Sequence, residues 1–124
     1  DGLDYPHGTG HGVGFFLNVH EGPQSISKYN SVQIRRGMIL SNEPGYYKKG
    51  HFGIRIENLM YVNKIKNKLS FENLTLAPIE KQLINYKLLN ENEKDYLFKY
   101  HLKIYTTYSK FLNLNERKWL ASLI

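Results

Sequence analysis

The chain has 124 residues, of which 17 are basic, 11 acidic and 41% hydrophobic, and it contains no cysteine. This composition fits one globular domain or part of a larger one, and it excludes disulfides, thiolate nucleophiles and cysteine-ligated zinc. No apolar run approaches the roughly 18 residues that a membrane span needs, so we expect no membrane partner. The lysines of the basic second half are scattered rather than gathered into a stripe, so we expect no nucleic-acid partner either.

The N-terminal segment concentrates histidine and glycine. Three of the five histidines lie between positions 7 and 20, and four glycines alternate with other residues between positions 8 and 14. Glycine costs roughly 1 kcal/mol relative to alanine inside a helix, so the run is expected to be looped or extended. Such a backbone lets a metal or substrate approach closely, while the imidazoles converge through tertiary folding. A glycine-rich turn that merely contains histidines is the alternative.

Short strands are predicted to follow this segment. Residues 15–20 predict a strand, 22–36 a surface loop, and 38–42 a buried strand that ends in turns over 43–45 and 46–51. Residues 52–62 predict the longest strand, with Arg55 and Glu57 on the same face. A hairpin-like turn over 64–68 leads into a further strand over 69–76, which stops near Pro78.

The last third of the chain changes to helical periodicity. Asn90 and Glu93 form a predicted capping box, followed by apolar or aromatic side chains at three- and four-residue steps. His101 lies within this stripe and is interpreted as a packed or edge residue rather than a ligand. A last helix is predicted from Asn115, with Trp119, Leu120 and Leu123 facing inward. Strands followed by helices predict an α+β fold.

Two carboxylates occupy positions that demand a partner. Glu43 ends the buried strand and Glu57 lies within the long one, where an unpaired buried charge would be costly. An ion pair with arginine or lysine satisfies this demand. If folding brings His11 close, the alternative is a metal site, because imidazole and carboxylate suit Mn, Co, Zn or Fe.

Four sequence blocks follow one another along the chain: HGTGHGVG at 7–14, VHEGP at 19–23, NEPGYY at 42–47 and GIRIEN at 53–58. In this order they resemble the blocks of aminopeptidase P, the Xaa-Pro aminopeptidase branch of the pita-bread metallopeptidases. The resemblance spans about positions 3–62. Residues 74–79 and the helices after them look like that branch's C-terminal extension. It implies the second half of a pita-bread fold, a curved antiparallel sheet followed by helices, with residues 1–78 in the catalytic domain and 79–124 as a helical extension packed on it.

The resemblance also implies roles for single residues. His11, Glu43 and Glu57 match metal ligands; Glu43 also matches the general base for a metal-bridging water, and Glu57 the bridge between both metals. Arg55 matches an arginine that orients the site. Two divalent ions are implied, with Mn the leading choice and Zn or Co as alternatives. Paired metals lower the pKa of a shared water and polarise the scissile carbonyl.

His7 and His20 match two catalytic histidines that bind the substrate and stabilise the oxyanion that forms. The implied reaction releases the N-terminal residue from peptides with proline in second position, in a cytoplasmic homodimer. The family also needs two aspartates from the preceding half of the fold, and neither Asp1 nor Asp4 matches them in context. The chain is therefore expected to be the C-terminal half of a catalytic domain and to be inactive alone.

Three alternatives bear on this assignment. Methionine aminopeptidases share a Gly-His-Gly core but lack the short spacing from Glu43 to Glu57. Prolidases share the later blocks but usually differ around residues 19–23. Non-catalytic pita-bread modules bind proteins or nucleic acid and typically lose metal ligands, whereas every ligand that this half supplies is present here.

Overall fold

The computed structural model describes residues 2–16 and 18–124. The chain divides into two compact units, Asp1–Thr75 and Leu76–Ile124. The first is built from short antiparallel strands and the second from helices, so the predicted α+β class is confirmed. No helix in the described ranges is long and apolar enough to cross a membrane.

The first unit contains a three-stranded antiparallel sheet in the order β3-β6-β7, formed by Ile39–Asn42, Asn58–Ile65 and Lys68–Asn73. Strands β4 (Gly45–Lys48) and β5 (Phe52–Arg55) form a hairpin, and β1 (Gly10–His11) pairs with β2 (Ser25–Ile26). Leu40 of β3 and Val62 of β6 are fully buried. Met60 and Val62 share one face of β6, as the period of two requires.

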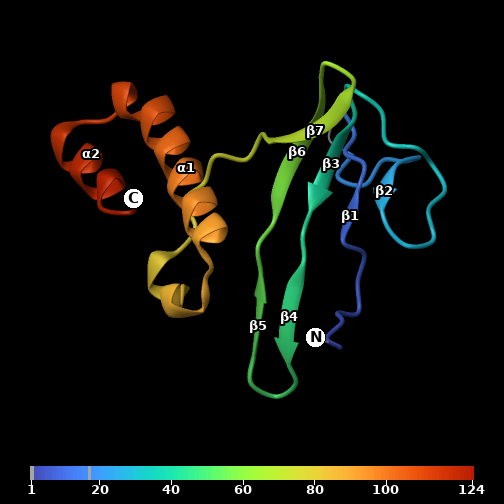
Figure 1. Ribbon diagram of the computed structural model, residues 1–124, viewed down its shortest axis with the longest axis horizontal. Helices are drawn as coiled ribbons and strands as arrows, with labels where there is room; N and C mark the ends of the chain where they lie inside the picture. The colour runs from blue at the N-terminus through green and yellow to red at the C-terminus, as the bar shows by residue number, and fades with distance from the viewer. Residues whose placement is uncertain (1, 17) are drawn as a thin grey trace. The chain divides into compact units, whose positions relative to one another are not determined.

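The predicted strand over 52–62 is interrupted in the structure. Its first part, β5, pairs with β4, and its second part, β6, pairs with β3. Figure 1 shows the β4–β5 hairpin continuing from the ends of β3 and β6. The break lies at Ile56–Glu57, opposite Glu43–Pro44, and Pro44 has no N–H with which to continue the ladder. One bond remains there, from the Ile56 N–H to the Pro44 carbonyl at 3.4 Å.

The second unit packs two helices, α1 (Glu91–Tyr108) and α2 (Leu114–Ala121). Its buried core is Tyr100, Ile104 and Leu120. Three 3₁₀ turns accompany the helices, at Lys81–Leu83 (η1), Tyr86–Leu88 (η2) and Ser109–Phe111 (η3). The capping box predicted for α1 is present, because Asn90 and Glu93 each accept the other's backbone N–H.

Three local predictions were wrong. The described part of 15–20 contains no strand, and Leu17 lies outside the described residues. The last helix begins at Leu114, one residue earlier than predicted, because Asn113 caps it and its side chain accepts the Glu116 N–H. Trp119 is 61% exposed, and Leu120 is the residue of this helix that is buried.

His101 is packed in α1, as predicted, and is 3% exposed. Its Nε2 accepts the backbone N–H of Ile79 at 3.1 Å, while the neighbouring Tyr100 hydroxyl donates to the Ala77 carbonyl at 2.8 Å. Adjacent side chains of α1 therefore bind the extended segment 77–79. Burial lowers the pKa of His101 below its ordinary value, and the positive charge of Lys81 acts in the same direction.

This contact predicts weaker anchoring of the segment in acid. A histidine whose pKa is lowered by folding contributes stability above its unfolded pKa of 6.5, and that stability is lost as the pH falls below 6.5 towards the folded value. Amide exchange of Ala77 and Ile79, corrected for intrinsic rates, is expected to accelerate below that pH. His101→Gln keeps an acceptor that does not titrate and should remove the acceleration. His51→Gln, at an exposed turn position, is the matched control.

Candidate active site

The glycine-rich segment brings His11 against β3. Gly12 forms an antiparallel bridge with Leu40, and the His11 N–H donates to the Ser41 hydroxyl at 2.9 Å. Glu43 donates its own N–H to the Thr9 carbonyl at 2.8 Å. A Cβ at position 10 would collide with the Ser41 carbonyl, so only glycine permits this approach.

A second close approach brings His20 to His11. The Gly12 N–H donates to the Gln24 carbonyl and the Glu21 N–H to the Gly12 carbonyl, each at 2.9 Å. A Cβ on residue 12 would collide with the backbone carbonyl oxygen of Glu21, so glycine is required here as well. The two imidazoles consequently lie with ring centroids 4.2 Å apart and planes at 49°. Two of the three predicted histidines of this segment are therefore in direct contact.

Three side chains contact the carboxylate of Glu43. Glu43 is 8% exposed and directly follows β3. Its Oε1 accepts the Ser41 hydroxyl at 3.0 Å and lies 3.2 Å from the His11 Nε2, while its Oε2 accepts the Arg55 Nη1 at 3.0 Å. A buried carboxylate requires such partners, because an uncompensated charge is costly in the interior.

The tautomer of His11 follows from its second nitrogen. Nδ1 lies 2.9 Å from the Gly12 carbonyl, which can only accept, so Nδ1 carries the proton. In the neutral ring, the lone pair of Nε2 then faces the Glu43 carboxylate, an arrangement that either a proton on Nε2 or a cation bound to both groups would satisfy. Histidines that bind metals typically donate their other N–H to a backbone carbonyl in this way. The pair thus fits one side of a site for a divalent metal.

A chain of hydrogen bonds connects Glu43 to His7. The Arg55 Nε donates to the Tyr47 hydroxyl at 2.9 Å, and that hydroxyl lies 2.6 Å from the His7 Nε2. His7 Nδ1 donates to the Gly8 carbonyl at 2.8 Å, so Nε2 accepts from Tyr47. The hydrogen bond to Tyr47 raises the pKa of Arg55, and the charges of Glu43 and Glu57 add to this effect.

Glu57 is placed by register rather than by a direct contact. Asn42 pairs with Asn58 in one sheet and Gly45 pairs with Arg55 in the next. The register runs unchanged through the interruption, so Glu57 falls opposite Glu43. Directly opposed residues share a face of the ribbon, and like charges in that position repel each other unless a cation intervenes.

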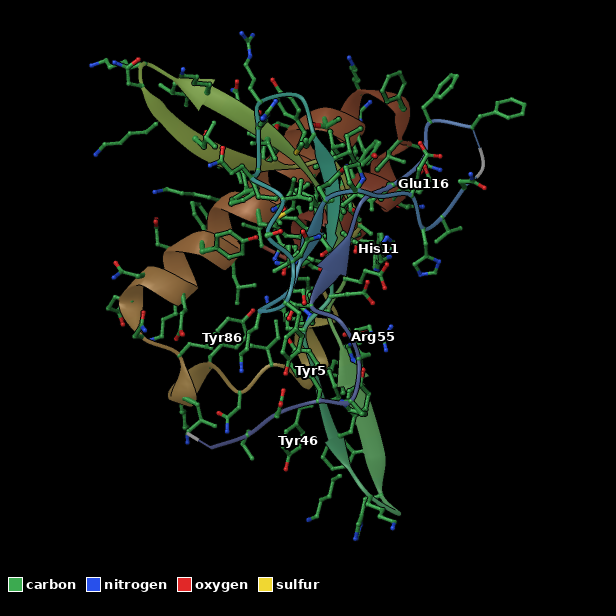
Figure 2. The ribbon with its side chains drawn as sticks, turned by 90° about the vertical axis from the view of Figure 1, so that its right-hand side faces the viewer. Tyr5, His11, Tyr46, Arg55, Tyr86 and Glu116 are labelled. Atoms are coloured by element: carbon green, nitrogen blue, oxygen red, sulfur yellow. The ribbon has the colours of Figure 1, made fainter. Side chains whose placement is uncertain are left out.

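The structure therefore assembles most of the predicted residues. His11, Glu43 and Arg55 touch, His20 packs on His11, and Tyr47 connects His7 to them, while Glu57 lies exposed across the ribbon. Figure 2 shows His11 and Arg55 one above the other along the strands. Among residues 2–16 and 18–124, no three His, Asp or Glu side chains form a group that could hold a metal ion.

Two residues of the site escaped prediction. Ser41 is fully buried and bonds both the His11 backbone and Glu43; its position two residues before Glu43 in a buried strand is a signal that could have identified it. Tyr47 bonds His7 and Arg55 from the neighbouring hairpin. Its side chain covers Gly45 and Gly53, where an added Cβ would meet the Tyr47 ring at 2.7 Å and 2.6 Å. A glycine two residues before Tyr47 and another opposite it in the hairpin are the sequence features that could have identified Tyr47.

The chain is similar to many known proteins. It is 50% identical over 127 residues to the putative Xaa-Pro aminopeptidase FRA1 of Saccharomyces cerevisiae, covering 96% of this chain and 17% of that protein. It is 46% identical over 136 residues to Xaa-Pro aminopeptidase 1 of Dictyostelium discoideum, covering 99% and 22%. The chain thus spans about a fifth of the length of these relatives.

A solved structure gives the same result. The X-prolyl aminopeptidase of Caenorhabditis elegans, described as a cytosolic enzyme with a di-nuclear active site, superposes with a TM-score of 0.87 at 40% identity. The match covers 98% of this chain and 21% of that one. The α+β unit with its two helices therefore matches part of a pita-bread aminopeptidase, as the resemblance implied.

Family models account for both units. Residues 1–64 match metallopeptidase family M24, and residues 67–123 match the C-terminal region of peptidase M24. The first match alone covers more than half of the chain and includes every predicted site residue. The chain therefore belongs to metallopeptidase family M24.

Proposed function

We propose that the intact protein releases the N-terminal residue from peptides whose second residue is proline. The observation that carries this proposal is the Glu43 carboxylate, held between His11, Ser41 and Arg55 at the end of β3. The names of the relatives support the substrate class, since those quoted above are Xaa-Pro or X-prolyl aminopeptidases.

His11, Glu43 and Glu57 are our proposed ligands for two divalent ions, with manganese the first choice. Imidazole and carboxylate donors suit these ions. His11 and the opposed carboxylates of Glu43 and Glu57 place a ring nitrogen and two negative charges beside the positive charge of Arg55, which supports the binding of a further cation at this point of the hairpin. When bound, the ions supply an activated water and polarise the scissile carbonyl.

The remaining steps belong to the chain's own side chains. Glu43 takes the proton of the attacking water, and Arg55 holds that carboxylate in place from its second oxygen. His20 donates to the oxyanion that develops on the substrate. Both nitrogens of His7 are engaged, so His7 contacts the substrate through its ring and through the Tyr47 hydrogen bond.

The decisive assay uses the intact protein with Mn²⁺. We expect release of the first residue from Ala-Pro-Ala and longer peptides, and at least about tenfold lower kcat/KM when alanine replaces the proline, since a better-filled pocket discriminates by that order. Activity on Xaa-Pro dipeptides alone would instead identify a prolidase. Metal binding without turnover of any peptide would identify a binding module.

Further properties of the intact protein are part of the proposal. We assign residues 1–78 to the catalytic domain and 79–124 to an extension packed on it, in a cytoplasmic homodimer. The cytosolic description of the worm enzyme supports the compartment. Residues 1–124 alone should be inactive, because three ligand side chains are too few for two bridged ions.

The two catalytic histidines provide a separate test. His7→Ala and His20→Ala should each keep the metal content of the intact protein while kcat falls, because neither residue is a proposed ligand. For His20, losing a donor to the oxyanion costs on the order of 10²–10³ in kcat. For His7, losing the contact with the substrate should also lower kcat. Metal analysis beside steady-state kinetics checks this expectation. A variant that loses metal would identify its histidine as a ligand and contradict the assigned role.

A further inference from the structure

A groove of about 410 Å³ opens in the first unit beside His7. It lies between residues 4–9, which lead into β1, and residues 26–29, which follow from β2. His7 lines this groove and also ends the hydrogen-bond chain that runs through Tyr47 to Arg55 and Glu43. The side chain of His7 therefore connects the groove to the candidate site, while Asp4, Tyr5 and residues 26–29 of its walls lie outside that site.

Three of the residues that line the groove carry aromatic rings, namely Tyr5, His7 and Tyr29. Tyr5 packs on His7 with ring centroids 4.8 Å apart, and its hydroxyl is 2.7 Å from the Thr9 hydroxyl. Both nitrogens of His7 are occupied. The Tyr29 ring on the far wall is almost fully exposed. Aromatic walls of this kind fit the flat, extended backbone of a peptide and its apolar side chains.

The groove is lined by two charged side chains, those of Asp4 and Lys28. Its one carboxylate is that of Asp4, whose Oδ1 accepts the Tyr5 N–H at 2.8 Å and which keeps its negative charge. Lys28 lines the groove and is exposed, and within the described part of the chain it forms no ion pair. An ammonium group in this position favours an anion over a neutral group.

The orientation of the bound peptide determines which of its residues can lie in this groove. An aminopeptidase binds the amino end of its peptide at the reacting atoms, so the rest of the peptide leaves the site on the carboxyl side only. A groove that shares His7 with the site is a path for that part of the peptide. The free cation of Lys28 then selects the group that every unmodified peptide carries at its far end, its terminal carboxylate.

We propose that this groove binds the residues that follow the second position of the substrate, and that Lys28 pairs with the terminal carboxylate of a short peptide. The inference rests on the proposed function and adds a preference for peptide length. Lys28 is a specificity-determining residue in this account. It touches the substrate far from the scissile bond and changes KM rather than kcat.

The test compares free-acid and amidated forms of Ala-Pro-Ala and of the same peptide extended stepwise to a hexapeptide, with the intact Mn²⁺-loaded protein. At the length that reaches Lys28, we expect KM for the acid to be about three- to fivefold lower than for the amide, the range of an exposed ion pair. Lys28→Ala should make the two values equal, and Lys28→Arg should keep them apart. Lys49→Ala, at the exposed turn between β4 and β5, is the matched control.

The outcomes distinguish a failure of the groove assignment from a failure of the proposed function. Cleavage of Xaa-Pro peptides without any acid preference that depends on Lys28 overturns the groove and leaves the proposed function standing. An acid preference that survives in Lys28→Ala places the carboxylate elsewhere and also overturns it. No cleavage of any peptide by the wild-type protein overturns the proposed function, and the groove assignment with it.

Discussion

Replacing Glu43 by glutamine is expected to lower kcat of the intact protein by at least about 10²–10⁴-fold, the usual contribution of a general base. The amide has nearly the same shape but cannot accept the proton of the attacking water. It also loses one negative charge next to His11 and Arg55, so we expect weaker binding of one metal ion in addition. Steady-state kinetics with metal analysis of the same preparation measures both effects.

The fold should survive this change. The glutamine oxygen can still accept the Ser41 hydroxyl, and the Arg55 side chain is 41% exposed and stays hydrated without its partner. Thermal melting of the metal-free protein should therefore change little. Glu72→Gln is the control, since Glu72 accepts a hydrogen bond from Asn63 on the sheet and lies outside the site. Unchanged activity in Glu43→Gln would remove Glu43 from the role of base.

Local signals predicted the helical unit well. The capping box of Asn90 and Glu93 involves residues three apart, and the buried Ile104 follows from helical period, so neighbouring residues carry the information. The same reasoning failed at Trp119, because two helices and one extended segment make a small core. Leu120 fills that core, and the larger side chain remains outside.

Predictions failed where the structure depends on distant pairings. Residues 52–62 alternate well enough to indicate one strand, yet Pro44 on the partner segment interrupts the ladder at Ile56–Glu57. The short strands β1 and β2 lack any local strand signal. They exist because Gly10 and Gly12 admit the Ser41 and Glu21 carbonyls.

The site residues also divide into those that the sequence indicates and those that only long-range pairing reveals. The strand positions of Glu43 and Glu57 indicate that both need a partner, but the roles of His11, Glu43 and Glu57 as metal ligands follow only from a resemblance, since no spacing along the chain joins positions so far apart. The contact of His11 with Glu43 depends on the bridge between Gly12 and Leu40, and that of Tyr47 with His7 depends on the hairpin. Ser41 and Tyr47 became visible only with these pairings, although both hold the groups that we expect to react.

Glu57→Gln is expected to abolish activity for a different reason, through loss of metal. Glu57 falls opposite Glu43 across the interrupted ribbon, and we propose that it joins both ions. Replacing a proposed bridge should weaken binding by more than the 10–100-fold typical of residues that only support a ligand. Metal content after dialysis should therefore fall in Glu57→Gln, and fall further than in Glu43→Gln, which removes the base and affects one ion.

The metal-free protein separates this role from a structural one. Opposed carboxylates repel each other by roughly 0.2–1 kcal/mol, so without metal Glu57→Gln should melt at the same temperature as the wild type or slightly above it. Added Mn²⁺ should raise the melting temperature of the wild type and of Glu72→Gln, but much less that of Glu57→Gln. Full metal occupancy in Glu57→Gln would refute the bridge, whereas a lower melting temperature without metal would show that Glu57 stabilises the ribbon directly.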